Sequence, residues 1–475
     1  MPKWRNGRRG GFKIRWACAR EGSNPSFGTA SPRSGRSVRS SPWRARTLLT
    51  TLLSTLPLAL LPSTTVFADD TGAPARPVDP GAPGDSGAAR LDADLRMRSL
   101  LSRGLSTLPA GLDVRRSGAY HRVRLGTDLR SGSFDARIEL QGAGAFGAAG
   151  PLEAPLQVGL QQAWLRWRTT RARAALSVEA GRMALQYGSG RQIGRYDFHP
   201  TGHAFDGVRI RGELDRVLQV DLLATRLRRD PSQRAVDRGL YGVLATAHPT
   251  GSLTGDVYLL VLRDGDEAGR HQLQTMGLRL QWEPWGVVLA EFETAAQVGR
   301  RSDDAPDADD RFAHMVAARL GAFGTLGLPF GGGLLIELYS GDDDPEDGVD
   351  RAWRPLYPDQ DRIVGLMQRF APTNLRAFGG WFELGARDRL SGRLEGRLFA
   401  QLNAPRVGDR GRGWQAIAGE IDARLRWTMD AGQQLELAGG VSLPSADPAT
   451  GAPALPLGAM VMLQWRGRFA SASNP

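Results

Sequence analysis

The chain has 475 residues, with 61 Lys and Arg against 50 Asp and Glu, and a formal net charge of +11. Residues 1–68 hold twelve of the basic residues and one acidic residue, so the rest of the chain is neutral overall, which argues against nucleic-acid binding. The single cysteine, Cys18, lies in the same leader and excludes a disulfide framework or a cysteine metal site after it.

The leader contains a predicted signal peptide at residues 38–68. Three arginines precede an apolar run at residues 48–61, and Val66-Phe67-Ala68 places acceptable residues at the −3 and −1 positions. These features predict a secretory signal cleaved before Asp69. The alternative, a membrane anchor, needs ~20 apolar residues, and this run is shorter and contains Pro57.

The segments on either side of the signal peptide show no folded pattern. Residues 1–37 are basic and lack apolar periodicity, and we interpret them as a non-native or disordered extension, with translation starting near Val38. Residues 69–89 are rich in Pro, Gly, Ala and Asp and are predicted to be a flexible periplasmic lead-in. Residues 90–470 then form one domain, followed by a tail at 471–475.

Alternation of apolar and polar residues dominates this domain. Residues 417–429 place Ile421 and Leu425 on one face and Asp422 and Arg424 on the other, and residues 457–469 alternate similarly. Such strands exceed the usual ~5–6 residues and suit a tilted membrane strand of ~9–11. After residue 69 there is no run of 18 apolar residues, so the sequence predicts no transmembrane helix.

Counting these segments in chain order predicts about 18 strands. They lie near 90–100, 119–129, 133–145, 157–169, 173–183, 204–214, 216–227, 238–248, 253–263, 271–283, 285–298, 311–323, 331–341, 375–388, 391–403, 414–429, 432–443 and 456–469.

The connections between these strands differ by parity. Even-numbered connections are tight, for example at Ser131-Gly132 and Asp430-Ala431, whereas the intervening ones are mostly long and polar, including 184–203 and 341–374. Short turns on one side and long loops on the other are typical of an outer-membrane β-barrel, with both termini periplasmic when the strand number is even. The sequence therefore predicts an all-β transmembrane antiparallel barrel, whereas a soluble periplasmic β-protein gives no reason for this parity.

Tryptophans near the predicted strand ends are typical of interfacial girdles, although each could instead be a core residue. The residues concerned are Trp164, Trp167, Trp282, Trp285, Trp414, Trp427 and Trp465.

Arginines recur on the polar faces of the predicted strands. They are Arg137, Arg166, Arg168, Arg209, Arg211, Arg397, Arg424 and Arg426. Carboxylates accompany them at Glu139, Glu213, Glu395, Glu420 and Asp422. Guanidinium groups that face a pore attract anions, and interspersed acids prevent trapping. The alternative is that these pairs only neutralise one another and brace the barrel.

Other chemistry finds weaker support in the sequence. His199 and His203 are four residues apart, but Pro200 and Gly202 prevent the helix that would align them on a metal, and no metal site is predicted. Ser189 or Ser340 with a histidine leaves an outer-membrane hydrolase as an open alternative. Acidic loops at 302–311 and 340–345 leave loop calcium open as the one cofactor interpretation, although a solvated loop is the simpler one.

The segment GRMALQYGSGRQIGRYDFHPTGHAFDGVRIRG at 181–212 resembles the signature of the alginate export family. A second match is YSGD at 339–342, followed by LYP at 356–358 and Asn374-Leu375. Met183 and Ser189 depart from the residues usual in the family. The resemblance spans about residues 90–470 and implies an 18-stranded outer-membrane barrel that passes a polyuronate through an electropositive constriction gated by loops.

The resemblance also implies roles for particular residues. Arg182, Arg191 and Arg209 would handle substrate, Asp206 would hold one of these arginines, and Asp342 with Asn374 would brace the long loop. We therefore expect a Gram-negative outer-membrane channel, without covalent chemistry, for export or diffusion of an anionic polysaccharide. Outer-membrane lipid, lipopolysaccharide and a periplasmic export protein are its expected partners. A general or small-anion porin is the alternative within the same class.

Overall fold

The computed structural model describes most of the predicted barrel domain. The described residues are 88–105, 116–146, 157–227, 237–266, 269–300, 310–326, 328–344, 347–385, 389–405, 412–445 and 455–471. The predicted extension, signal peptide and lead-in lie outside these residues.

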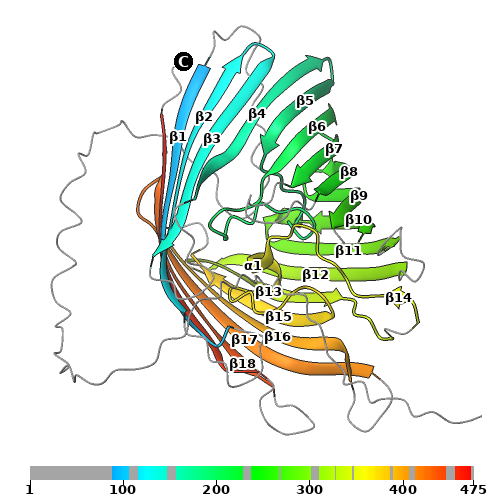
Figure 1. Ribbon diagram of the computed structural model, residues 1–475. Coiled ribbons are helices and arrows are strands. Elements are labelled where there is room, and N and C mark those ends of the chain that lie inside the picture. Colours follow the sequence, from blue (N-terminus) through cyan, green and yellow to red (C-terminus); the bar gives the residue numbers. More distant parts are fainter. Residues whose placement is uncertain are drawn as a thin grey trace, which may run out of the picture. The chain divides into compact units, whose positions relative to one another are not determined.

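Eighteen long strands in the described residues form one closed antiparallel sheet, in which each strand pairs with its neighbours in sequence and β1 (Ala88–Arg103) closes on β19 (Gly458–Ala470). Figure 1 shows the strands following one another in chain order. The strands between these two are β2 (Arg116–Ser131), β3 (Phe134–Phe146), β4 (Gln157–Arg171), β5 (Ala174–Met183), β6 (Phe205–Leu214), β7 (Leu218–Leu227), β8 (Asp237–Thr250), β9 (Leu253–Asp266), β10 (Gly269–Trp282), β11 (Val288–Arg300), β12 (Asp310–Leu326), β13 (Leu328–Tyr339), β15 (Leu375–Leu384), β16 (Leu390–Pro405), β17 (Arg412–Thr428) and β18 (Gln433–Pro444). Each of the predicted strands overlaps one of these.

Three short elements accompany the barrel strands in the described residues. They are the 3₁₀ turn η1 (Pro284–Gly286), the helix α1 (Gln360–Ile363) and the two-residue strand β14 (Val349–Asp350), which pairs parallel to β12. None of the helices described reaches the length and apolarity needed to cross a bilayer.

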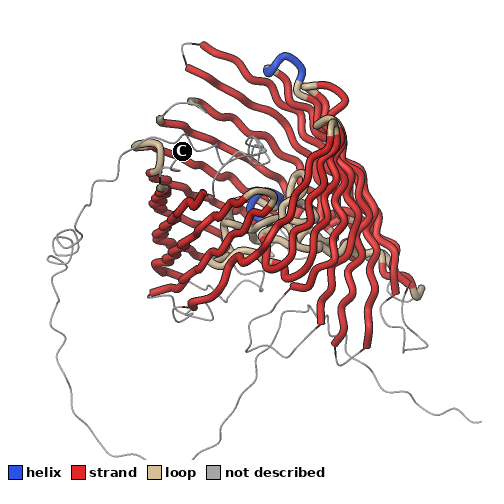
Figure 2. The backbone as a smooth tube through the Cα atoms, turned by 90° about the horizontal axis from the view of Figure 1, so that it is seen from above, coloured by secondary structure: helices blue, strands red, loops and turns tan. Residues whose placement is uncertain are grey.

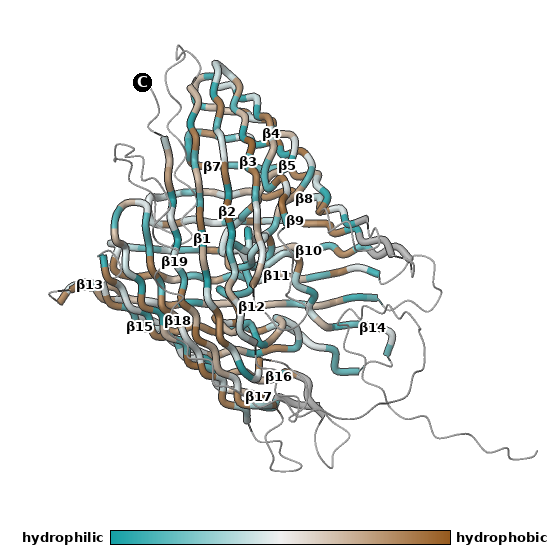
Figure 3. The backbone as a smooth tube through the Cα atoms, turned by 60° about the vertical axis from the view of Figure 1, so that its left-hand side comes forward, coloured by the Kyte–Doolittle hydropathy of each residue, from teal (hydrophilic) through white to brown (hydrophobic). Residues whose placement is uncertain are grey.

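The two faces of the wall have opposite character. Ile421 and Leu425 are about half exposed on the outer face of β17, whereas Glu420 and Asp422 on its inner face are buried. Figure 3 shows the corresponding alternation of hydrophobic and hydrophilic residues along the strands. Exposed apolar residues outside and charged residues inside are the pattern of a barrel whose outer surface faces lipid.

The predicted parity of the connections is confirmed at the tight turns. Gly132, Ala172 and Asp215 occupy these turns with φ of 54°, 51° and 52°, the left-handed conformation that closes a short hairpin. Because the first strand begins and the last strand ends on the side of these turns, both ends of the barrel lie there. Outer-membrane topology identifies this side as periplasmic.

Two long connections fill the interior of the barrel. Loop A, residues 184–204, joins β5 to β6, and loop B, residues 340–374, joins β13 to β15. Figure 2 shows these segments in tan between the walls of strands. Leu185 and Ile193 of loop A pack with Trp353 and Ile363 of loop B in one buried apolar cluster. Loop A therefore enters the lumen instead of projecting away from the long-loop end of the barrel.

The tryptophan prediction holds for four residues close to the periplasmic turns. Trp167, Trp282, Trp285 and Trp427 expose 38%, 46%, 83% and 49% of their surface there. Trp164 is different, because it shares the inner face with Arg166 and packs against the interior cluster. For Trp164 the core interpretation is the correct one.

Candidate functional site: a lumen crossed by two loops

A row of arginines lines the inner wall where β1, β2 and β19 meet. Arg96 and Arg98 alternate along β1, and Arg122 and Arg124 do so along β2. Arg466 joins them from β19, at the position directly opposite Arg96 in the ladder. We call these five residues the basic wall. None of the five is among the predicted site residues, although the same period-2 spacing is present in these strands.

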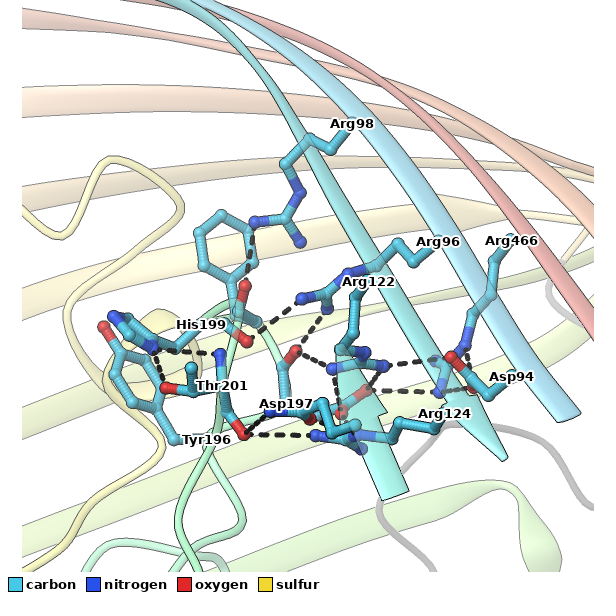
Figure 4. Close-up of polar contacts among 12 residues, drawn as sticks. Asp94, Arg96, Arg98, Arg122, Arg124, Tyr196, Asp197, His199, Thr201 and Arg466 are labelled. Atoms are coloured by element: carbon cyan, nitrogen blue, oxygen red, sulfur yellow. Dashed lines mark hydrogen bonds and ion pairs between the residues drawn. The ribbon is translucent and has the colours of Figure 1, made fainter. Parts of the chain in front are cut away.

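Loop A docks onto the basic wall through Asp197. The Asp197 carboxylate accepts hydrogen bonds from Arg122 Nη1 at 2.7 Å and Arg124 Nη1 at 3.0 Å, and lies 3.2 Å from Arg466 Nη2. Figure 4 shows these guanidinium groups converging on the loop. One loop carboxylate thus occupies three cations of the wall.

Backbone carbonyls of loop A occupy further guanidinium groups. Arg98 donates to the Phe198 carbonyl at 2.8 Å, Arg96 donates to the His199 carbonyl at 3.0 Å and to the Asp197 carbonyl, and Arg124 donates to the Thr201 carbonyl at 3.3 Å. The guanidinium of Arg98 also lies 4.0 Å from the centre of the Phe198 ring. Residues 197–201 therefore present a run of oxygen acceptors to the basic wall.

The basic wall fixes the charge state of the loop. Burial by itself raises the pKa of Asp197, but the surrounding guanidinium groups, with Arg122 the largest contributor, hold that pKa well below its ordinary value. Burial, followed by the neighbouring His203 and Arg96, lowers the pKa of His199 to about 4. At neutral pH the docked loop therefore carries an ionised Asp197 beside a neutral His199.

An acidic cluster on the opposite wall binds the other end of the loop. Arg191 Nη1 lies 2.8 Å from Glu291 and 3.2 Å from Glu293 on β11, and Arg191 Nη2 lies 3.1 Å from Glu337 on β13. The Arg191 side chain is only 10% exposed. Three inward-facing carboxylates thus share one arginine, which is the counter-charge that buried acids require.

Together the two contacts form a strap across the lumen, which we define as Arg191–Asp197. In the ring of eighteen described strands, β2 and β11 are nine strands apart and so lie on opposite sides. Six residue steps span at most ~20 Å, and the long Arg side chains at both ends supply the remaining reach. A single short segment is therefore held at both walls by ion pairs of opposite polarity.

Loop B crosses loop A at the middle of the strap. Ile193 forms a parallel bridge with Tyr357, in which Gly194 N–H donates to the Tyr357 carbonyl at 2.8 Å. The Asp359 carboxylate accepts a hydrogen bond from the Tyr196 N–H. A Cβ at Gly194 would lie 2.8 Å from the backbone nitrogen of Asp359, so glycine permits this crossing.

Loop B is fixed independently to the wall. Arg397 donates to the carbonyls of Ile363 and Arg362, and the Leu366 N–H donates to the Asp422 carboxylate at 3.0 Å. At the end of the loop, the Asn374 N–H donates to the Ser340 carbonyl at 3.0 Å. The Asn374 side-chain oxygen accepts from the Leu402 N–H of β16 at 3.2 Å.

Asp342 lies at the start of loop B. Burial raises its pKa, while backbone hydrogen bonds from Arg351 and Asp344 act in the opposite direction. These contacts fold the segment onto itself, and the bracing role of Asp342 and Asn374 stays a prediction.

Most of the predicted pore-lining residues lie on the inner face. Arg166 and Arg209 both bind Glu179, Arg168 lies 3.4 Å from Asp135, and Arg211 binds Asp221 at 2.9 Å. On the far wall Arg426 lies 3.2 Å from Glu436. Arg424 lines a small pocket with Asp361 of loop B, and Glu213 lies on the inner face of β6 near its periplasmic end.

Arg182 and Asp206 are exceptions, and the pore-lining prediction for them is wrong. They form a bidentate pair with both N···O distances at 2.6 Å, as a holding role for Asp206 implied. However, Arg182 is directly opposite Ala163, on the face of exposed Leu165, and Asp206 shares its face with exposed Val208. Because strands alternate strictly, this pair lies on the outer surface.

The serines and histidines weighed for hydrolase or metal chemistry form hydrogen bonds with other groups of the barrel and its loops. The Ser189 hydroxyl donates to Glu293, and the Ser340 hydroxyl donates to the Arg351 carbonyl at 2.7 Å. His203 Nδ1 lies 3.0 Å from the Gly194 carbonyl, and His199 Nδ1 lies 3.0 Å from Thr201 Oγ1.

Within the described part of the chain, no group of three or more His, Cys, Asp or Glu is arranged to hold a metal. Much of the acidic loop at 302–311 is outside the described residues, so calcium binding there stays a prediction.

Comparisons with known proteins agree with this architecture. A family model described as alginate export matches residues 107–444. No curated protein matches the chain.

Among solved structures, OpdK from Pseudomonas aeruginosa with vanillate aligns with a TM-score of 0.55 at 13% identity, covering 80% of this chain and 98% of that chain. OccK2 (OpdF) from the same organism, in complex with glucuronate, gives 0.55 at 13% identity over 81% and 97%. A further structure of OpdK from Pseudomonas aeruginosa gives 0.53 at 14% identity over 80% and 99%. At these identities the likeness concerns the fold.

Proposed function

Because this chain belongs to the alginate export family, whose members are outer-membrane channels, we propose that it conducts an anionic polysaccharide of the polyuronate type through its arginine-lined interior. The observation that carries the proposal is the occupancy of the basic wall. Asp197 and the adjacent loop carbonyls fill positions suited to the carboxylates and hydroxyls of an acidic sugar chain. Guanidinium groups bind carboxylates in this manner irrespective of their source.

The proposed mechanism is exchange of ligands at the basic wall. A uronate carboxylate entering from the periplasm replaces Asp197 on Arg122 and Arg124, and loop A moves away from that wall while Arg191 keeps its other end on the acidic cluster. Successive arginines then pass the carboxylates along the wall. The protein performs no covalent chemistry, and a periplasmic partner supplies the polymer.

The direct test is block of ionic current by oligouronates of increasing length in a planar bilayer. The proposal predicts block from the periplasmic side that becomes stronger with chain length, because more carboxylates contact more arginines at once. The variant Arg122→Gln/Arg124→Gln should weaken block by about tenfold or more, since charge-assisted hydrogen bonds are lost. Arg216→Gln, a substitution at the exposed turn between β6 and β7, is the matched control.

A small-anion porin remains the second candidate, and the filled lumen favours it. Loops A and B pack together in one apolar cluster. Passage of a polymer requires a large movement of these loops, whereas passage of a small solute requires a smaller one. OccK2 was crystallised with glucuronate, a single uronic acid. Equal block by a monouronate and a long oligouronate would favour this function over polymer conduction.

A further inference from the structure

A patch of arginine lies on the outer surface of the barrel, apart from the lumen. Arg182 on β5, Arg226 on β7 and Arg263 on β9 all have the parity of exposed apolar residues on their strands. Asp206 on β6 is the only acidic residue among the described outward side chains between them. We call Arg182, Asp206, Arg226, Tyr241 and Arg263 the outer patch, which has a net positive charge.

The ladder brings these residues to one line across five adjacent strands. Arg182 is directly opposite Asp206, Asp206 is opposite Arg226, and Arg226 is opposite Gly239, which is itself opposite Arg263. Neighbouring strands are ~4.8 Å apart, so the outer charges are spread over roughly 20 Å. That spread matches a headgroup with more than one anionic group.

An aromatic ring connects the two exposed arginines. The Tyr241 ring is 37% exposed and lies over Gly239, where a Cβ would meet the ring at 2.7 Å. The guanidinium of Arg263 lies 5.6 Å from the centre of that ring. Because residue 239 is glycine, the Tyr241 ring can tilt toward the long-loop end of the barrel. The ring then lies between Arg226 and Arg263, and its hydroxyl is at the same height on the wall as these two arginines.

The position of the outer patch relative to the membrane identifies its ligand class. Arg182 and Arg226 are each the penultimate residue of their strands, at the ends that lead into long loops. Toward the periplasmic turns the same outer face carries exposed Val208, Leu222 and Leu259. Cations directly above an apolar band lie where the phosphates of the outer leaflet meet the acyl chains.

We propose that the outer patch binds the phosphorylated disaccharide headgroup of lipid A, the glycolipid of the outer leaflet. Arg226 and Arg263 contact phosphate oxygens, Tyr241 donates to the same headgroup, and Asp206 orients Arg182 beside them. The apolar residues below contact the acyl chains. This inference rests on the outer-membrane location of the proposed channel but not on what the channel conducts.

The test is native mass spectrometry of the delipidated full-length barrel titrated with diphosphorylated lipid A. Wild type should bind it at least about tenfold more tightly than Arg226→Gln/Arg263→Gln, with monophosphorylated lipid A intermediate. Arg300→Gln, at an outward ion pair with Asp310 elsewhere on the barrel, is the matched control and should bind like wild type. Heat-dependent gel mobility establishes that each variant is folded.

Three results would overturn the proposal. Equal lipid A binding by wild type and the double variant removes the outer patch as the site. Equal affinity for diphosphorylated and dephosphorylated lipid removes phosphate recognition. Displacement of lipid A by inorganic phosphate at similar concentration indicates a simple anion site rather than a lipid surface. Since channel current is measured separately on the wild type, a conducting barrel without lipid A binding contradicts this inference alone.

Discussion

At the residue scale, single side chains of loop A determine how the lumen is occupied. Arg191 forms ion pairs with three carboxylates at one wall, and Asp197 forms ion pairs with three guanidinium groups at the other. Removing one member of a buried ion-pair network leaves the remaining charges uncompensated, at a cost of about 3–5 kcal/mol. Each end of the strap is thus sensitive to one substitution.

We expect Arg191→Ala to release loop A from the acidic wall and to raise single-channel conductance. Its docking free energy should fall by about 3 kcal/mol, because Glu293 and Glu337 then lose their arginine and, among the described ion pairs, only that of Arg279 with Glu291 at 3.6 Å remains beside the cluster. Arg195→Ala, at an exposed side chain of the same loop, should leave conductance near the wild-type value. Unchanged conductance in Arg191→Ala would contradict the strap.

Asp359 makes the contact between the two loops depend on pH. Burial and the nearby Asp361 carboxylate raise the pKa of Asp359 from 3.8 to about 6. The docked state therefore binds a proton more readily than the undocked state, and docking is favoured at low pH and weakens as pH rises through about 6.

We expect current fluctuations of the wild-type channel to increase between pH 5 and pH 7 because the loops separate more often. Asp359→Asn keeps an oxygen acceptor for the Tyr196 N–H and removes the charge, so its fluctuations should not depend on pH in this window. The opposite sign in wild type, or the same pH dependence in Asp359→Asn, would show that another group controls the contact.

At the element scale, alternation made the strands predictable and left the loops unpredicted. All eighteen expected strands overlap strands of the structure, because a wall between lipid and lumen imposes a period of two. The same rule placed Arg209 and Arg211 inward correctly. Applied to Asp206, it gives the outer face that exposed Val208 shares, whereas the family resemblance implies a role for Asp206 in the pore.

The path of loops A and B could not be read from local patterns. Their docking depends on pairs that are far apart in sequence, such as Arg191 with Glu337 and Asp197 with Arg466. Loop sequences rich in Gly and Pro show no periodicity that indicates which wall they contact. The structure explains one of the glycines in 181–212. Loop B passes so close to Gly194 that there is no space for a side chain.

Gly194→Ala tests whether the crossing of the two loops holds them in the lumen. The added Cβ meets Asp359 at 2.7–2.9 Å, and such overpacking costs about 1–3 kcal/mol. We expect faster hydrogen exchange at the Gly194 and Tyr357 amides, which make the bridging bonds.

Gly212→Ala is the control for this substitution, since a Cβ at Gly212 has no neighbour within 4 Å among the described residues. Exchange that rises equally in both variants would indicate a general loss of barrel stability. Exchange that rises in neither would show that the crossing does not restrain the loops.

At the scale of the whole molecule, the closed sheet leaves no strand edge, and β1 pairs with β19 over twelve residue positions. A barrel of this kind resists detergent at room temperature and unfolds on boiling. The described domain contains exposed apolar residues over its outer wall, which water does not stabilise. The outer surface of the barrel therefore suits a lipid bilayer, and its charged residues face the lumen.

Gel electrophoresis in detergent tests this architecture in the simplest way. We expect the unboiled protein to migrate differently from the boiled protein, because the closed barrel stays compact until heated. Identical mobility of the two samples would favour a soluble β-protein. A truncation that removes β19 should abolish the difference by opening the sheet.

The central claim is that the arginine-lined interior conducts anions. The most direct measurement is the reversal potential of the wild-type channel in a planar bilayer under a KCl gradient, on protein in which heat-dependent mobility has been confirmed. We predict a reversal potential with the sign of the chloride equilibrium potential, which indicates anion selectivity. In Arg122→Gln/Arg124→Gln the reversal potential should shift toward zero, because the basic wall loses charge. A reversal potential of the sign set by potassium, or the absence of any current, would contradict it.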